Sequence, residues 1–194
     1  DDLHLEDLGE HHLRDLARPE RLFQVRAPGL AGDFPPLRSL SSVRTNLPLP
    51  TTDLLGREEE VRALAALVAD ERLLTLAGPG GIGKTRLAME VAAAIGGSFV
   101  DGVWFVDLAP VVEDDDVAGA VAAAMGAGGT VASEPALLGY LEQRRLLLVL
   151  DNCEHVIEGA ASVLSGLLEG APEVHTIATS RELVDVQGAV VQWV

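Results

Sequence analysis

The sequence has little cysteine and no long apolar runs. Its one cysteine, Cys153, excludes an internal disulfide and leaves no cysteine cluster for zinc, as fits a reducing cytosol. No segment has the pattern of a signal peptide, and no apolar run approaches the ~18 residues needed to span a bilayer. We therefore expect a cytoplasmic segment without a membrane partner.

Positive charge is also scarce. The chain has 30 acidic residues against 14 basic ones, for a net charge of −16. Such a surface repels a polyphosphate duplex. We therefore expect no direct nucleic acid contact from this segment, while a DNA-binding domain can still lie elsewhere in a longer protein.

Lysine is the scarcest of the charged residues. Lys84 is the single lysine, and the remaining members of the 14 basic residues are arginines. A bias toward arginine explains why lysine is rare, but it does not explain the position of this one. Lys84 lies in AGPGGIGKT, residues 77–85, which matches the phosphate-binding pattern G-x-x-x-x-G-K-[ST].

The chain divides into two units by composition. Residues 27–50, APGLAGDFPPLRSLSSVRTNLPLP, are dense in Pro, Gly and Ser without helical or strand periodicity, which predicts a linker. Residues 1–26 before it are too short to form a core of their own. Residues 51–194 after it are long enough for one α/β domain, which we expect to stop short of further helical or winged-helix parts.

Helical and strand patterns alternate through that domain. Continuous apolar runs such as LLLVL, 146–150, are typical of strands buried on both faces. Alternation of this kind predicts an α/β fold with a doubly wound parallel sheet of five strands flanked by helices. With the phosphate-binding pattern at residues 78–85 placed between a strand and a helix, the expected fold is that of a P-loop NTPase. The expected strands are 73–77, 103–108, 146–150, 175–179 and 190–194. A first helix is expected to open at residues 56–60, with Val61, Leu64, Leu67 and Val68 on one face, and further helices are expected at 84–95, 116–125, 133–143 and 155–169.

The glycine loop has the residues that a nucleoside triphosphate requires. Glycines let the backbone curl around phosphates with its N–H groups inward, at the start of a helix whose dipole adds positive potential. Lys84 supplies a slim point charge that the planar guanidinium of arginine imitates poorly, and the hydroxyl of Thr85 is expected on Mg²⁺. The predicted phosphate-binding residues are Gly78, Pro79, Gly80, Gly81, Ile82, Gly83, Lys84, Thr85 and Arg86.

Two acids follow the LLLVL strand. Asp151 closes it and resembles a Walker B aspartate that holds Mg²⁺ through its water shell, with a helix N-cap as the alternative. Many relatives have an acid directly after this aspartate, but here that residue is Asn152. Glu154 is the nearest acid for a catalytic role, or else an ordinary acid of the first helical turn. Rapid hydrolysis is therefore not predicted.

Thr179-Ser180-Arg181 closes the fourth expected strand. In a P-loop sheet with an extra strand between the loop strand and the Walker B strand, that end faces the γ-phosphate, so Arg181 is expected to sense it. The alternative is a solvated arginine that caps a loop.

Taken together, these motifs resemble the nucleotide-binding domain of the STAND class of signalling ATPases (AAA/NB-ARC-like). The similarity is to bacterial multidomain regulators with LuxR-type, SARP-type or cyclase-type domains, and it covers residues 54–194 through LLGREEEV, LAGPGGIGKTRLA, GVWFVDLA, RRLLLVLDNCEH and IATSRE. The resemblance implies that Gly56 and Arg57 lie against adenine, although Arg57 also suits an ordinary helix surface. No NKxD-like guanine motif is present, which favours adenine.

Residues 8–25, LGEHHLRDLARPERLFQV, resemble the closing strands of a class III adenylate/guanylate cyclase domain. None of the metal-binding acids of a cyclase lies in them. The alternative is a short amphipathic leader.

These observations predict a switch domain of a larger cytoplasmic signalling or transcriptional regulator. It binds ATP or ADP with Mg²⁺, hydrolyses ATP slowly, and changes domain arrangement with nucleotide state. Its expected partners are nucleotide, other domains of the same chain, and further copies of itself in a nucleotide-dependent way. Two alternatives remain open: the regulatory domain of a nucleotide cyclase, and a scaffold that binds nucleotide without turnover.

Overall fold

The computed structural model describes residues 4–11, 20–26, 44–48, 56–131 and 133–194. Near the N-terminus, β1 (His4–His11) and β2 (Glu20–Arg26) pair antiparallel as a separate two-stranded sheet. Leu5, Phe23 and Val25 of this hairpin are exposed, and Arg21 pairs with Asp7 at 2.6 Å. Two paired strands agree with the form expected for residues 8–25, while their origin in a cyclase domain stays a prediction.

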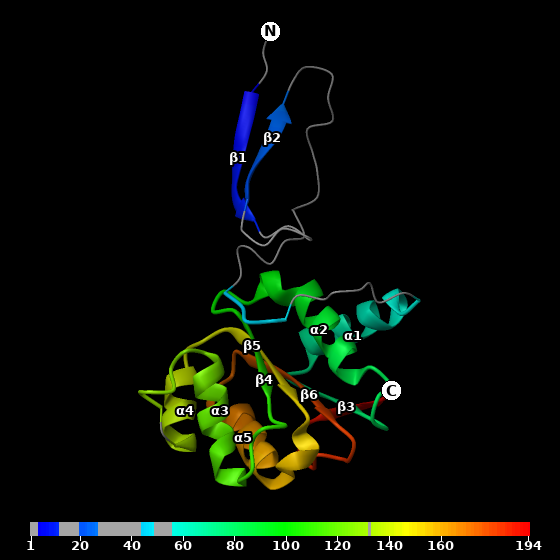
Figure 1. Cartoon of the computed structure of the whole chain (residues 1–194), viewed down its shortest axis with the longest axis vertical. Coiled ribbons are helices and arrows are strands. Elements are labelled where there is room, and N and C mark those ends of the chain that lie inside the picture. The colour runs from blue at the N-terminus through cyan, green and yellow to red at the C-terminus, as the bar shows by residue number, and fades with distance from the viewer. Residues whose placement is uncertain (1–3, 12–19, 27–43, 49–55, 132) are drawn as a thin grey trace.

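The remaining elements form one five-stranded parallel sheet with helices on both faces (Figure 1). Its strands are β3 (Leu73–Ala77), β4 (Val103–Asp107), β5 (Leu146–Asp151), β6 (Val174–Ser180) and β7 (Val190–Trp193). Its helices are α1 (Glu58–Asp70), α2 (Lys84–Ile95), α3 (Val117–Ala124), α4 (Glu134–Leu141) and α5 (Ile157–Gly170), with short 3₁₀ helices at Gly96–Ser98, Asp114–Asp116 and Cys153–His155. The predicted α/β fold with a doubly wound parallel sheet is confirmed.

The strands lie in the order β4-β5-β6-β3-β7. β6 is therefore the extra strand between β3, which precedes the glycine loop, and β5, which ends in Asp151. Each pair is parallel, so the carboxyl ends of β3, β5 and β6 lie at one edge of the sheet. This edge is where open α/β sheets bind ligands.

Each face of the sheet has its own apolar core. One lies between the sheet and α1 and α2, and includes Leu64, Val68 and Leu87; the other lies between the sheet and α3, α4 and α5, and includes Leu137 and Leu164. All residues of β5 are buried, as its continuous apolar sequence predicts.

Part of the segment expected as a linker, 27–50, lies against the sheet. Among its described residues, 44–48, Thr45 forms a parallel bridge with Val103 of the edge strand β4, and the side chain of Asn46 hydrogen-bonds to both backbone groups of Phe105. Leu47 is buried in the core beside α1 and α2. Residues 44–48 are thus docked on the domain, and residues 27–43 and 49–50 lie outside the described residues.

Candidate functional site

The glycine loop connects the end of β3 to the start of α2. Gly78, Gly81 and Gly83 have φ angles of 148°, 79° and 92°, a region that residues with a Cβ rarely adopt. No atom lies within 4 Å of the place where a Cβ would stand on Gly81. The backbone at Gly81 is therefore open next to a helix N-terminus, as a phosphate site requires, while the places of a Cβ on Gly78 and Gly80 are close to Val194 and Arg181.

Lys84 is the first residue of α2, and only 8% of it is exposed. Its Nζ donates hydrogen bonds to the carbonyl oxygens of Gly78 and Pro79, both at 2.8 Å. Three donors on an ammonium leave capacity for a further acceptor. Burial of a cation costs free energy unless it is well paired, so its place under the loop points to a role for the charge.

The structure brings together the two residues predicted to hold magnesium. The hydroxyl of Thr85 donates to Asp151 Oδ1 at 2.7 Å, and Asp151 is 4% exposed. The alternative of Asp151 as a helix N-cap is wrong, because Asp151 belongs to β5 and the residues before the next two helices are Asn152 and Val156.

Thr179 of β6 belongs to the same cluster, although the sequence analysis did not single it out. Its hydroxyl donates to Asp151 Oδ1 at 2.5 Å and accepts from the backbone N–H of Asn152 at 3.2 Å. The sequence signal that could have identified Thr179 is a hydroxyl side chain at the carboxyl end of a strand that pairs with β5. A single oxygen of Asp151 thus accepts hydrogen bonds from hydroxyl groups on two different elements, α2 and β6.

Asn152 has a φ of 61° and is the one residue other than glycine with a positive φ in the described part of the chain. Its side-chain amide donates to Asp107 Oδ1 at 2.9 Å and to Asp151 Oδ2 at 3.1 Å. Asp107, at the end of β4, is a second residue that the motifs did not reveal. A neutral amide thus links the carboxylates of Asp107 and Asp151.

Glu154 and Arg181 form an ion pair at the same edge of the sheet. The Nε of Arg181 lies 2.9 Å from Glu154 Oε1, and the backbone N–H of Arg181 donates to Glu154 Oε2 at 3.3 Å. The guanidinium lies over the glycine loop, where a Cβ on Gly80 would stand 3.2 Å from Nε. The predicted catalytic acid and the predicted sensor are therefore in direct contact.

A cavity of about 330 Å³ opens between these groups. It is lined by Gly80, Gly81, Gly83, Lys84, Thr85, Arg86, Met89, Asn152, Glu154, Thr179 and Arg181. Within it, Arg86 forms an ion pair with Glu90 at 2.8 Å on α2. Most of the predicted phosphate and metal residues thus surround one hollow at the ligand-binding edge.

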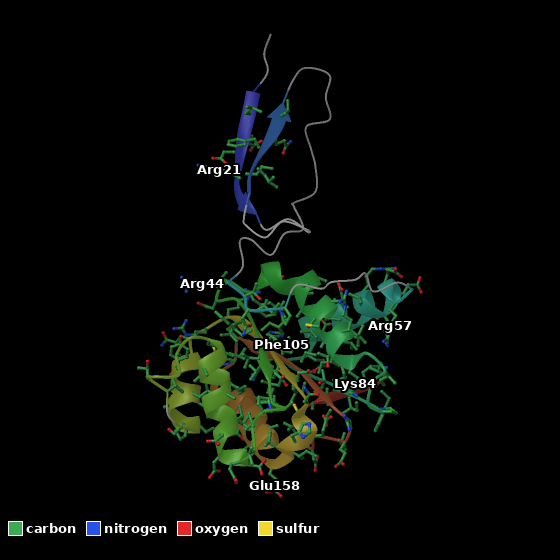
Figure 2. All side chains as sticks on the ribbon, viewed as in Figure 1. Arg21, Arg44, Arg57, Lys84, Phe105 and Glu158 are labelled. Atoms are coloured by element: carbon green, nitrogen blue, oxygen red, sulfur yellow. The ribbon has the colours of Figure 1, made fainter. Side chains whose placement is uncertain are left out.

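Arg57, just before α1, also reaches the loop. Its Nη1 donates to the carbonyl of Ile82 at 3.4 Å, and Nη2 donates to Glu60 Oε1 at 2.7 Å. The hydrogen bonds to Glu60 raise the pKa of Arg57 further, so its charge is permanent. Arg57 and Lys84 lie toward the same side of the domain in Figure 2. Gly56, with a φ of 77°, precedes it, and the contact of both residues with adenine stays a prediction.

Cys153 is fully buried beside this site, and burial together with the charges of Asp151 and Glu154 raises the pKa of its thiol to about 12. A neutral thiol is a poor nucleophile, so Cys153 is a small core residue. In the described part of the chain no group of three or more His, Cys, Asp or Glu side chains is arranged to hold a metal ion. The same residues contain no helix that is both long and apolar enough to cross a bilayer.

The chain is similar in sequence to bacterial regulators, while no family model matches it. It is 42% identical over 129 residues to a protein named as an HTH-type transcriptional regulator in Mycobacterium tuberculosis, covering 66% of this chain and 14% of that protein. It is 33% identical over 159 residues to the regulatory protein AfsR of Streptomyces griseus, covering 74% of this chain and 16% of AfsR. The chain thus spans about one seventh of these relatives.

Solved structures show the same fold at low sequence identity. Cdc6p from Pyrobaculum aerophilum matches with a TM-score of 0.51 and 14% identity, over 74% of this chain and 46% of that chain. Drosophila ORC bound to AT-rich DNA and Cdc6 matches with a TM-score of 0.50 and 17% identity, over 69% of this chain and 53% of that chain. Because this neighbour is a DNA complex, the comparisons do not support the expectation that the segment makes no nucleic acid contact. The solved structures thus show the fold, and the sequence relatives show the similarity to bacterial regulators.

Proposed function

We propose that this chain contains the ATP/ADP-binding switch domain of a multidomain signalling or transcriptional regulator of the STAND class, with slow Mg²⁺-dependent ATP hydrolysis. One observation carries the proposal: the single lysine of the chain is buried beneath a glycine loop that leads from a central strand into a helix. The similarity to regulators supports the signalling context. Cytoplasmic location and contact with other domains of the same chain belong to this proposal.

The residues around the cavity fit the phosphates of a nucleotide. The N–H groups of the loop from Gly78 to Gly83 would bind phosphate oxygens, and Lys84 would exchange its bonds to loop carbonyls for bonds to them. Arg86 lines the same cavity and would add a second positive charge. Gly56 and Arg57 would lie toward the base.

Magnesium fits the pair formed by Thr85 and Asp151. A small hard cation that keeps several waters needs one or two protein oxygens beside the phosphates, and these two side chains already converge at 2.7 Å. When bound, the cation would neutralise phosphate charge and favour phosphoryl transfer to water. Thr179 and Asn152 hold the carboxylate of Asp151 in position from β6 and from the end of β5.

Hydrolysis is expected to be slow because the site lacks an acid at position 152. The amide of Asn152 cannot accept a proton from an attacking water as a carboxylate can. Glu154 lines the cavity and is our candidate for that role, but in this structure it is paired with Arg181. A scaffold that binds nucleotide without turnover is the second candidate function, and the amide at 152 favours it.

Calorimetric titration of ATP and ADP with Mg²⁺ tests the proposal. We expect the wild-type chain to bind both, and Lys84→Ala to lose at least tenfold in affinity, since a charge-assisted hydrogen bond contributes about 1.5–3 kcal/mol. Arg145→Ala is the matched control, because it removes one positive charge at the start of β5, on the opposite edge of the sheet. A folded Lys84→Ala chain that binds as tightly as wild type would contradict the proposal.

Phosphate release measured over hours then separates the two candidate functions. Release that depends on Mg²⁺ and stops on chelation identifies a slow ATPase. Binding without release identifies the scaffold.

A further inference from the structure

The two side chains of the ion pair between Glu154 and Arg181 differ in their exposure to solvent. The side chain of Glu154 is 11% exposed, whereas that of Arg181 is 62% exposed. Glu154 is fixed in the 3₁₀ helix after β5, and its second oxygen already accepts the backbone N–H of Arg181. The carboxylate is therefore the stationary partner, and the exposed guanidinium is the group that can turn away.

The guanidinium lies directly beside the glycine loop. Its Nε, Cζ and Nη2 atoms stand 3.2, 3.3 and 3.4 Å from the place of a Cβ on Gly80. A larger residue at Gly80 would displace it. Both Arg181 and Glu154 line the cavity that contains Lys84 and Thr85. Arg181 is thus within reach of any phosphate bound in the cavity, but its charge is directed toward Glu154.

We propose that Glu154 competes with the terminal phosphate of a nucleoside triphosphate for Arg181, and so sets the preference between triphosphate and diphosphate. This inference rests on the proposed function of the cavity. A triphosphate has an additional anionic group that can attract the guanidinium, whereas a diphosphate leaves the pair with Glu154 intact. The free energy of breaking the pair is subtracted from triphosphate binding alone.

The pair also determines when Glu154 is free. While the guanidinium of Arg181 is paired, it lies against Oε1 of Glu154, and Oε2 accepts the backbone N–H of the same residue. Once the guanidinium turns to a phosphate, Oε1 is left nearly buried and without its charged partner, next to the cavity, while Oε2 keeps the backbone N–H. Recognition of triphosphate and release of the carboxylate are then one event, and Glu154 acts as a positioning residue for Arg181.

The test is the ratio of ATP to ADP affinity in the 194-residue chain, measured by calorimetry with Mg²⁺ for wild type and Glu154→Gln. Glutamine keeps the shape and an acceptor for the backbone N–H but removes the charge that holds the guanidinium. We expect ATP affinity to increase about three- to fivefold more than ADP affinity, the upper range for a partly exposed ion pair.

Two controls separate this competition from a general loss of negative charge. Glu182→Gln removes a neighbouring exposed carboxylate and should change the ratio by less than about twofold. In an Arg181→Gln background, Glu154→Gln should also leave the ratio within about twofold, because the competing group is absent. A change of the same size in either control would overturn the inference.

The outcomes also distinguish the inference from the proposed function. If wild type binds neither nucleotide while folded, the proposed function fails. If wild type binds both nucleotides and Glu154→Gln changes the two affinities equally, the site binds nucleotide as proposed and the competition is wrong.

Discussion

At the scale of single residues, Asp151 at the end of β5 receives hydrogen bonds from helix α2, from strand β6 and from the residue that follows it. Its Oδ1 accepts hydrogen bonds from the hydroxyl groups of Thr85 and Thr179, and its Oδ2 accepts a hydrogen bond from the side-chain amide of Asn152. Two of these donors come from other elements, so the position of the carboxylate depends on correct packing of α2 and β6 against β5. A carboxylate with this number of donors is strongly oriented before any cation arrives.

Two buried threonines allow that orientation to be tested. Thr179→Val keeps the shape but leaves Asp151 and the N–H of Asn152 without one partner, so the free energy of unfolding should fall by about 1–3 kcal/mol. Thr75 of β3 is also fully buried, but its Oγ1 has no hydrogen-bond partner in the structure. Thr75→Val should therefore be neutral or stabilising by up to about 1 kcal/mol.

Urea denaturation of both variants provides the measurement. Thr75→Val serves as the matched control, since it makes the same chemical change in a neighbouring strand. Equal losses of stability in the two variants would show that valine fits the sheet poorly, and not that the hydroxyl of Thr179 orients Asp151.

The sequence was sufficient to predict some residues of the site but not others. Lys84 and Asp151 belong to patterns with fixed spacing, so they can be recognised without a structure. Thr179 and Asp107 have no such spacing, because their contacts depend on the register of β6 and β4 against β5. The pairing of Glu154 with Arg181 could not be predicted either, since the two residues are distant in the sequence and meet only through the strand order.

At the scale of elements, the edge strand β4 is covered by residues 44–48. Asn46 accepts the N–H of Phe105 at 2.6 Å and donates to its carbonyl at 2.8 Å, as a neighbouring strand would. The carbonyl of Arg44 accepts the N–H of Val103 at 2.8 Å. A short segment thus satisfies backbone groups that an open edge would leave to solvent or to another chain.

Asn46→Ala tests this contact. We expect the free energy of unfolding to fall by about 1 kcal/mol, because two hydrogen bonds near solvent are lost. Gln187→Ala, which removes an exposed amide at a loop, should change stability by less than about 0.5 kcal/mol. Thermal denaturation of both variants gives the comparison, and equal behaviour would mean that Asn46 adds nothing to the edge in solution.

The strands and α-helices of the sheet domain were predicted from apolar runs and periodicity, whereas the three short 3₁₀ helices among its described residues were not, and residues 44–48 were expected to be part of a linker. Alternation of apolar runs and amphipathic segments identifies elements that bury their own side chains. The segment at 44–48 has proline- and serine-rich neighbours, and its attachment depends on one asparagine that imitates a strand and on one leucine in the core. Composition alone cannot distinguish such a segment from a free linker.

At the scale of the whole molecule, the net charge of −16 is large for a chain of 194 residues. Like charges repel one another in the compact state, and salt screens that repulsion. We expect the melting temperature to rise by about 2–5 °C between about 20 and 300 mM NaCl, as monitored by circular dichroism.

Lys84→Ala is the control for the salt effect. If the rise reflects general screening, the variant should show it undiminished. A rise that disappears in Lys84→Ala would instead indicate binding of chloride under the glycine loop, and a fall in melting temperature would contradict the expectation.

The strand order also has a consequence during synthesis on the ribosome. Among the described residues β3 pairs with β6 and β7 alone, and Leu74 pairs with Ile177 and Val190, which lie 103 and 116 residues further along the chain. At a translation rate of about 5–20 residues per second, the strand that leads into the glycine loop waits roughly 5–20 s for its first neighbour. During that time its apolar side chains depend on chaperones or on α1 and α2 for cover. The cavity at the glycine loop is therefore among the last parts of the domain to be completed, and a ligand that binds there can assist folding only after β6 has been made.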